Sequence, residues 1–409
     1  MNESRLFRAS CLALVATAMT FAIRGDIMGD FEKILSLDKT HVGAIAGAAF
    51  WGFGLSILFG GPLCDLLGMN TLLRLAAAGH IGGTLLTIVA PSYPILYLAT
   101  LIVGIANGLV EAAVNPLVAT IYSRDKTAKL TLLHAWFPGG IVIGGVLAFL
   151  ISQMSTPGAD GILTIGGWPA WQVKMLLILF PAAAYAYLFL GVTFPPTERE
   201  AAGVPFSEMF RELARPLFLV VWLSMWLTAA TELGFGQWVS NIFNDVMQST
   251  AQAGVLVLVW TNGLMYVMRQ FFGNVSHRVS PVALIATTSV PAALGLFLFS
   301  QASTPVQAFG AAALVAIGVA FWWPTMLGIT SERFPKGGAL ALAVIGATGS
   351  VSTAISGPVM GWMNDAFGPR MVLAYWAILP CILFAIFGAI YLADKSRGGY
   401  RVERIQQHG

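Results

Sequence analysis

The sequence has few charged residues for its length. Of 409 residues, 10% are Asp, Glu, Lys or Arg, whereas an average soluble domain has about 25%. Hydrophobic residues make up 57% of the chain and the mean hydropathy is +0.77. This balance excludes an ordinary soluble domain, and no basic stripe interleaved with aromatic residues suggests a nucleic-acid partner. We therefore expect a membrane protein.

The chain also has little of what catalysis or metal binding requires. It contains three cysteines, an odd number spread over distant apolar runs, so neither a disulfide framework nor a zinc cluster is expected. The sequence shows no phosphate-binding loop, metal quartet or nucleophile triad. We expect no enzymatic activity, no cofactor and no metal, so an ion gradient or the substrate gradient must drive any transport.

Long apolar runs recur along the whole chain. A helix rises 1.5 Å per residue, so each run is long enough to cross a hydrocarbon core of about 30 Å. We predict an all-α membrane protein with twelve transmembrane helices in two six-helix halves. The predicted spans are residues 9–29, 41–67, 71–90, 94–122, 129–153, 171–194, 216–246, 251–274, 281–301, 306–330, 338–364 and 369–393.

The distribution of Lys and Arg predicts the orientation. Most of them fall in the loops of one side, which the positive-inside rule assigns to the cytoplasm. Both termini are then cytoplasmic, in a plasma (bacterial inner) membrane. The first run follows Arg5 and Arg8 and resembles a signal peptide, but it continues to Phe21, so we expect it to remain as the first span.

The longest polar connection divides the chain near its midpoint. We predict an N-terminal bundle (1–195), a cytoplasmic linker (196–214) with a short amphipathic helix near 207–213, a C-terminal bundle (215–393) and a cytoplasmic tail (394–409). Two halves of similar hydropathy suggest a parallel repeat, as in large transporter folds, with the substrate site between the halves near the bilayer midplane.

A motif in the connection between the second and third spans carries a first resemblance. The stretch GGPLCDLLG resembles the Gly-x-Leu-x-Asp-x-x-Gly signature of the major facilitator superfamily, matched by Gly61, Asp65 and Gly68. The resemblance implies that these residues gate the cytoplasmic side. The family places basic residues directly after the second glycine, but here Arg74 is the nearest cation.

One carboxylate lies in the fourth apolar run, GIANGLVEAAVNPLVA. Glu111 is placed near the bilayer centre, where an ionised carboxylate costs at least about 2.5–3.5 kcal/mol, so the neutral form is favoured. Asn107 and Asn115 share its helix face at i−4 and i+4, and Pro116 removes a backbone hydrogen bond. We predict that Glu111 carries a proton and that the two amides bind substrate. Polar helix packing is the alternative.

The same segment carries a narrower resemblance. The order Gly-x-x-Glu-x-x-x-Asn-Pro resembles the fourth helix of the fucose/glucose-galactose permease branch, most members of which are sugar–proton symporters. Stretches at 132–145, 231–241 and 321–340 agree with it. The resemblance implies alternating-access symport of a monosaccharide or related hydroxylated solute with H⁺, and assigns a share of proton coupling to Asp26. Na⁺ is the alternative coupling ion.

A cation close to Asp26 complicates that assignment. Arg24 precedes Asp26 by two residues, so the two side chains point in different directions on a helix. We expect Arg24 to act as a charge partner of Glu111 or Glu232 across the cavity. Such a pair would weaken the case for that carboxylate as a proton carrier.

A second set of polar and aromatic residues lies in later spans. Indole rings stack on the C–H faces of sugars and amides bond their hydroxyls, while Glu232 and Arg269 are candidates for an ion pair. The further predicted substrate-binding residues are His134, Glu232, Gln237, Trp238, Asn241, Asn262, Arg269, Trp322 and Trp323. We expect a monomer in contact with lipid whose partner is a small molecule. An exporter or antiporter of small metabolites or drugs is the alternative.

Overall fold

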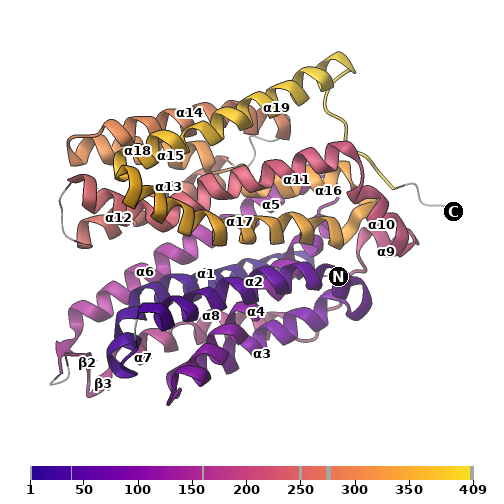
Figure 1. Ribbon diagram of the computed structural model, residues 1–409. Helices are drawn as coiled ribbons and strands as arrows, with labels where there is room; N and C mark the ends of the chain where they lie inside the picture. The colour runs from indigo at the N-terminus through magenta and orange to yellow at the C-terminus, as the bar shows by residue number, and fades with distance from the viewer. Residues whose placement is uncertain (1, 38, 159–160, 248–250, 273–277, 406–409) are drawn as a thin grey trace. The chain divides into compact units, whose positions relative to one another are not determined.

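The chain is almost entirely helical. The computed structural model describes residues 2–37, 39–158, 161–247, 251–272 and 278–405 (Figure 1). Within these residues, eleven helical spans are long and apolar enough to cross a membrane. The 22-residue helix α13 (Ala251–Phe272) supplies the twelfth. The prediction of an all-α membrane protein with twelve spans, six on each side of the central connection, is therefore confirmed.

The first compact unit comprises residues 1–117 and 136–196. Within it α1 packs against α6 and α8, and α3 packs against α8. Its helices are α1 (Glu3–Ile34), α2 (Lys39–Leu67), α3 (Met69–Ile88), most of α4 (Tyr93–Ile121), α6 (Trp136–Met154), α7 (Ala170–Leu176) and α8 (Leu179–Phe189).

The second compact unit comprises residues 118–135 and 197–409. Helix α14 packs against α15 and α19, and α12 against α13. Besides α13, its elements are α5 (Lys126–His134), α9 (Glu198–Ala201), α10 (Phe206–Leu213), α11 (Pro216–Ala229), η1 (Ala230–Gly234), α12 (Phe235–Met247), α14 (Pro281–Gln301), α15 (Pro305–Val319), α16 (Trp322–Arg333), η3 (Pro335–Gly337), α17 (Gly338–Phe367), α18 (Pro369–Trp376) and α19 (Ile378–Ser396).

The first unit ends at residue 196, and the division differs from the predicted bundle of residues 1–195 in residues 118–135. Residues 118–135 belong to the second unit because α5 packs against α16. Gly328 provides the room, since a Cβ there would lie against the side chain of Thr127. The hydroxyl of Thr127 donates to Glu332 at 2.6 Å. The fifth predicted span is thus broken between α5 and α6, and its first part joins the other unit.

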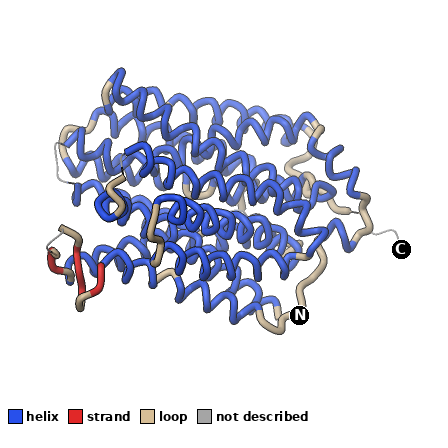
Figure 2. Tube along the Cα trace, turned by 60° about the horizontal axis from the view of Figure 1, so that its bottom comes forward, coloured by secondary structure: helices blue, strands red, loops and turns tan. Residues whose placement is uncertain are grey.

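A small sheet that the sequence analysis did not predict lies between the fifth and sixth spans. Three antiparallel strands in the order β1-β2-β3 form it: β1 (Thr156–Pro157), β2 (Leu163–Ile165) and β3 (Trp168–Pro169) (Figure 2). Gly166 and Gly167 make the turn between β2 and β3 with φ of +57° and +82°, values that favour glycine.

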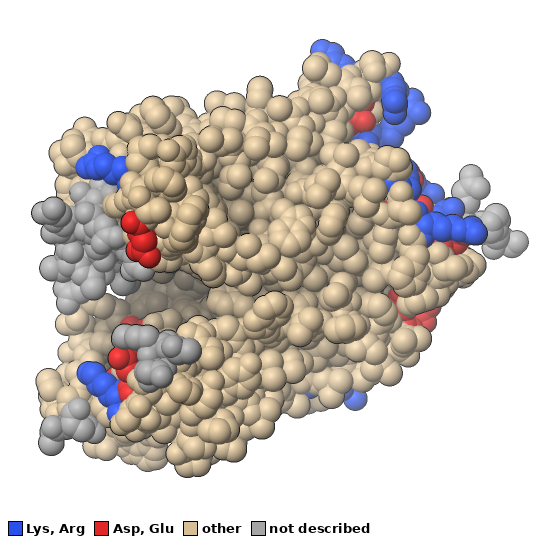
Figure 3. Space-filling view, in the orientation of Figure 1, with Lys and Arg blue, Asp and Glu red and all other residues tan. Residues whose placement is uncertain are grey.

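Charged side chains concentrate near the ends of the helices. On the face drawn in Figure 3, Lys, Arg, Asp and Glu lie towards the helix ends, and a broad band without them lies between. Large apolar side chains are exposed on helix surfaces, such as Phe59, Phe180 and Leu223 at 63%, 76% and 56%. Exposed apolar surface of this kind is what a lipid environment accommodates.

Helices α2 and α4 pack closely because of two glycines one turn apart. A Cβ on Gly104 would lie 2.5 Å from the carbonyl oxygen of Ala49, and one on Gly108 would overlap Phe53 O and Ser56 Oγ. The hydroxyl of Ser56 then donates to Ile105 O across the contact at 2.9 Å. Small residues at this spacing let two backbones approach, as is common between membrane helices.

We expect Gly108→Ala to lower the free energy of unfolding by about 1–3 kcal/mol, the usual cost of overpacking. Gly82→Ala on α3 is the matched control, since nothing lies within 4 Å of a Cβ there. Alanine favours a helix over glycine, so the control should be neutral or more stable by up to about 1 kcal/mol. Denaturant unfolding in detergent, followed by tryptophan fluorescence, compares them. Equal stability of the two variants would contradict the close packing.

Candidate functional site

The polar face of α4 is built around Glu111. This residue is 3% exposed and Asn115 is 5% exposed. The amide nitrogen of Asn115 donates to Glu111 Oε2 and to Glu111 O, both at 2.9 Å. One turn of helix thus brings the two predicted residues together, and Asn115 is a donor to the carboxylate.

The proline that follows Asn115 has a visible consequence. Pro116 has no N–H group, so the carbonyl of Ala112 loses its helical partner. The thiol of Cys64 on α2 lies 3.2 Å from that oxygen and donates to it. Cys64 therefore supplies the hydrogen bond that Pro116 cannot, and α4 continues through the proline as one helix.

Asn107 belongs to a different network. Its Oδ1 lies 2.7 Å from His80 Nε2, and its amide nitrogen donates to the hydroxyl of Thr20 at 2.9 Å. His80 Nδ1 lies 2.9 Å from Tyr185 Oη. Because Oδ1 accepts, Nε2 carries the proton and Nδ1 accepts from the tyrosine. His80, Asn107 and Tyr185 are each 0% exposed, so this network holds four helices together in the core.

The hydrogen bonds of this network occupy the amide group of Asn107. Its oxygen and amide nitrogen bond other residues rather than facing a ligand, so the arrangement favours a packing role over the predicted substrate contact. Neither His80 nor Tyr185 was among the predicted site residues. The available signal was a histidine inside the apolar run of α3, but its partners lie 27 and 105 residues away.

Asp26 forms an ion pair with Lys174 of α7. The lysine side chain is 4% exposed and the aspartate side chain 38%. Lys174 was not among the predicted site residues. The predicted proton-coupling residue Asp26 is thus in contact with a cation, and its part in coupling stays a prediction.

Arg24 lies one half-turn before Asp26 and is 8% exposed. Among the described residues its Nη1 is buried without a hydrogen-bond partner. Glu232 is bonded by Arg269. The pairing of Arg24 with Glu111 or Glu232 stays a prediction.

The predicted gate residues lie where α2 meets α3. Gly68 is the single residue between the helices and has φ of +80°, which requires glycine. Gly61 is buried, Asp65 is partly buried and Arg74 is exposed. The turn explains the second glycine of the motif. The gating role of these residues stays a prediction.

In the second unit, Glu232 and Arg269 form the predicted ion pair. Arg269 Nη2 donates to Glu232 Oε1 at 2.6 Å, and the two side chains are 3% and 4% exposed. Glu232 lies in η1, a π-helical turn within the seventh span. Such turns insert one extra residue into a helix and are frequent at functional sites.

Two helix breaks supply the remaining partners of Arg269. Its Nη1 donates to His134 O at 2.9 Å, at the end of α5, and its Nε donates to Ala320 O, between α15 and α16. Carbonyls at helix ends lack intrahelical partners. Each of the three guanidinium nitrogens of Arg269 therefore donates a hydrogen bond. The predicted residue His134 takes part through its backbone oxygen.

The other predicted residues of this unit have varied surroundings. Trp322 is 0% exposed and donates to Thr288 Oγ1 at 2.9 Å, while Trp323 packs against Gly349. Trp238 donates to Gly357 O at 3.0 Å, and Asn262 bonds its own helix at Leu258 O. Gln237 is exposed. Asn241 belongs to α12, but its side chain lies outside the described residues.

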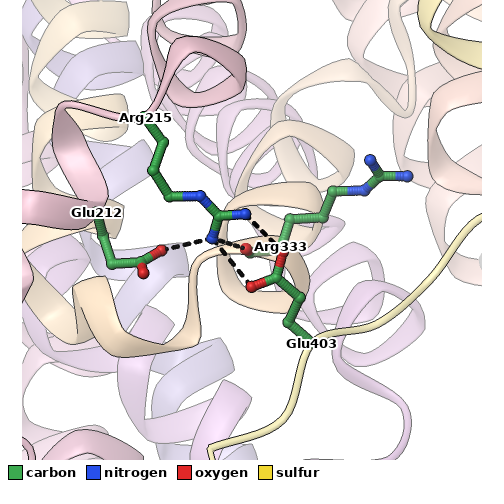
Figure 4. A network of polar contacts seen from close by, with 4 residues as sticks. All are labelled: Glu212, Arg215, Arg333 and Glu403. Carbon is green, nitrogen blue, oxygen red and sulfur yellow. Dashed lines mark hydrogen bonds and ion pairs between the residues drawn. The ribbon is translucent and has the colours of Figure 1, made fainter. Parts of the chain in front are cut away.

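A separate polar network joins the C-terminal tail to the helices of the second unit (Figure 4). Arg215 donates to both carboxylate oxygens of Glu403 at 2.7 and 2.9 Å, to Glu212 at 2.8 Å and to the carbonyl of Arg333 at 3.0 Å. Hydrogen bonding to Glu403 is the largest effect that raises the pKa of Arg215 above its usual value.

The tail also covers the contact between α5 and α16. Tyr400 Oη donates to Glu332 Oε2 at 2.8 Å, while Thr127 occupies Oε1 of the same carboxylate. Burial, followed by the Glu332 charge, holds the pKa of Tyr400 well above its ordinary value, so the hydroxyl keeps its proton. The guanidinium of Arg333 lies 4.4 Å from the centre of the Tyr400 ring.

Metal binding finds no support in the described part of the chain. Groups of three or more His, Cys, Asp or Glu side chains that could hold a metal ion do not occur among the residues with a described position.

We expect Arg269→Met to lower the free energy of unfolding by about 3–5 kcal/mol, because it leaves the Glu232 carboxylate buried without a cation. The double variant Arg269→Met/Glu232→Leu removes both charges and should recover most of that loss. Thermal and denaturant unfolding of the purified protein compare the two. If the double variant is as unstable as the single one, the ion pair is not what the surrounding helices depend on.

Comparison with known proteins identifies the family. The Major Facilitator Superfamily model matches residues 6–339. A gentisate transporter of Corynebacterium glutamicum is 22% identical over 366 residues, which are 83% of this chain and 77% of the relative. The 4-hydroxybenzoate transporter PcaK of Acinetobacter baylyi is 22% identical over 94% of this chain and 92% of its own.

A solved structure shows the same fold. The E. coli fucose:proton symporter FucP superimposes with a TM-score of 0.77 at 16% identity, covering 94% of this chain and 98% of that one. All of these proteins are transporters, and the family is not enzymatic. The family match covers more than half of the sequence, and the chain belongs to the Major Facilitator Superfamily of membrane transporters.

Proposed function

We propose that this protein is a proton-coupled secondary transporter that takes up a small hydroxylated organic solute by alternating access. The proposal places it in the plasma (bacterial inner) membrane, as a monomer with both termini in the cytoplasm. The observation that carries it is the buried Glu111 carboxylate, which receives its hydrogen bond from an amide.

The partner of a buried carboxylate decides whether it can exchange a proton. Glu232 is held in an ion pair by the guanidinium of Arg269. Asn115 donates a hydrogen bond to Glu111 but brings no charge. A buried carboxylate in a membrane favours its neutral form, and ionises when water or a cation reaches it. Glu111 is therefore the group best suited to load and release H⁺, with Asp26 in a secondary role.

Two substrate classes fit a hydroxylated solute. A monosaccharide is supported by the likeness of the fold to a fucose:proton symporter and by the resemblance of α4 to the sugar permease branch. A hydroxylated aromatic acid is supported by the sequence relatives, which are named as transporters of gentisate and of 4-hydroxybenzoate. Export of metabolites or drugs on the same fold is the remaining alternative, and the direction of transport in a vesicle assay separates it.

We expect Glu111→Gln to abolish concentrative uptake while sparing exchange. The measurement uses proteoliposomes with an imposed pH gradient, labelled L-fucose, D-glucose, gentisate and 4-hydroxybenzoate, and an internal pH dye. A gradient of one pH unit provides about 1.4 kcal/mol, or tenfold accumulation for each coupled proton. Glutamine keeps the hydrogen bonding of the site, so substrate counterflow should continue without acidification.

Glu3→Gln is the matched control, because Glu3 is exposed at the start of α1. Protein-free liposomes correct for acids that cross the bilayer unaided. Concentrative uptake by Glu111→Gln equal to that of the wild type would remove Glu111 from the coupling mechanism.

A further inference from the structure

Arg24 and Arg269 are both buried within membrane spans, and their surroundings differ. Arg269 is 2% exposed, and all three of its nitrogens donate to protein oxygens. Arg24 is 8% exposed, and its Nη1 is buried without a partner among the described residues. A charged donor left unsatisfied in a low-dielectric interior is strongly unfavourable. The fold therefore retains a buried cation with an unsatisfied hydrogen-bond donor.

The carboxylates nearest to Arg24 along the first unit have other positions and partners. Asp26 is paired with Lys174. Glu111 lies four residues beyond Asn107 on α4, while Arg24 lies four residues beyond Thr20 on α1. Thr20 and Asn107 are hydrogen-bonded, and successive spans run in opposite directions. The helix register thus places Arg24 and Glu111 about 12 Å apart along the helix axes.

Aromatic rings lie one turn from Arg24. Phe21 precedes it by three residues, which places both side chains on one face of α1. The ring of Phe21 lies 5.3 Å from that of Phe50, 5.6 Å from Phe53 and 6.2 Å from Phe137, measured between centroids. Three of these four rings are only partly buried; Phe53 is the buried one. A cationic hydrogen-bond donor thus stands beside an aromatic cluster.

We propose that Arg24 binds the carboxylate of the transported solute and that the Phe21 cluster packs against its ring. The substrate is then a small aromatic monocarboxylate, an inference that rests on the proposed function of a proton-coupled transporter. A planar guanidinium matches a carboxylate with two parallel hydrogen bonds. One cation balances one negative charge, whereas a phosphate ester would call for more. A neutral sugar would leave Arg24 uncompensated.

The first test compares ligands on the unmodified protein. Binding of 4-hydroxybenzoate, 4-hydroxybenzamide and L-fucose to the protein in nanodiscs is measured by calorimetry. The amide has the same ring and hydroxyl but no charge, so we expect it to bind at least about 30-fold more weakly, since a site built for a polar group rejects an analogue that lacks it. Equal affinity for acid and amide would overturn the proposal.

The second test changes the receptor. Arg24→Gln should bind 4-hydroxybenzoate at least about 30-fold more weakly than the wild type. Arg24→Lys should have an intermediate affinity, because lysine keeps the charge but cannot form two parallel hydrogen bonds. Arg211→Gln is the matched control, since the Arg211 side chain is 77% exposed on α10.

Without ligand, Arg24→Gln should melt at a higher temperature than the wild type, because it removes an unsatisfied charge. A purely structural arginine would give the opposite shift. Retained affinity for the acid, or a lower melting temperature, would overturn the proposal.

The two proposals fail in different ways. If L-fucose is concentrated with protons in a Glu111-dependent manner and no carboxylate binds, the Arg24 inference is wrong and the proposed function stands. If the carboxylate binds through Arg24 but uptake never acidifies the vesicles, proton coupling fails and Arg24 remains the receptor of the solute.

Discussion

Every polar group in the interior of a membrane protein needs a partner from the protein, because the lipid offers none. This constraint explains the most irregular features of the chain. Pro116 frees a carbonyl and the thiol of Cys64 occupies it. The breaks after α5 and α15 free two more carbonyls, and Arg269 bonds both. Each helix interruption is therefore stabilised by a side chain that bonds the freed carbonyl, although the two lie far apart in the sequence.

The same constraint separates the two buried glutamates. Glu232 lies on a π-helical turn and contacts a guanidinium whose three nitrogens all donate hydrogen bonds, so the ion pair joins several helices. Glu111 lies on a regular turn of α4 and accepts a hydrogen bond from the amide of Asn115 on the same helix. The first glutamate thus links distant segments, whereas the described contact of the second is local, and the proposed function builds on this difference.

The sequence predicted the features that depend on neighbours along the chain. Apolar runs indicated all twelve spans, and the i, i+4 spacing placed Asn115 beside Glu111, as the structure shows. The ion pair of Glu232 with Arg269 was also among the candidates. Contacts between distant segments were not predictable: Lys174 meets Asp26 across 148 residues, and His80 meets Tyr185 across 105. The break that moves α5 into the second unit also lies within one continuous apolar run, where hydropathy gives no signal.

Among the described residues, Nη1 of Arg24 is a charged donor that does not meet this constraint, and this makes it informative. Folding alone favours either an apolar residue at position 24 or a carboxylate that bonds the arginine. The chain has an arginine there, and its Nη1 has no hydrogen-bond partner. Asp26 lies two residues away, yet its carboxylate forms an ion pair with Lys174. Natural proteins keep such locally unfavourable groups mainly where function uses them. In a transporter the solute can supply the missing partner. The binding free energy of an anion then includes removal of the unfavourable free energy of the unsatisfied guanidinium in the ligand-free protein.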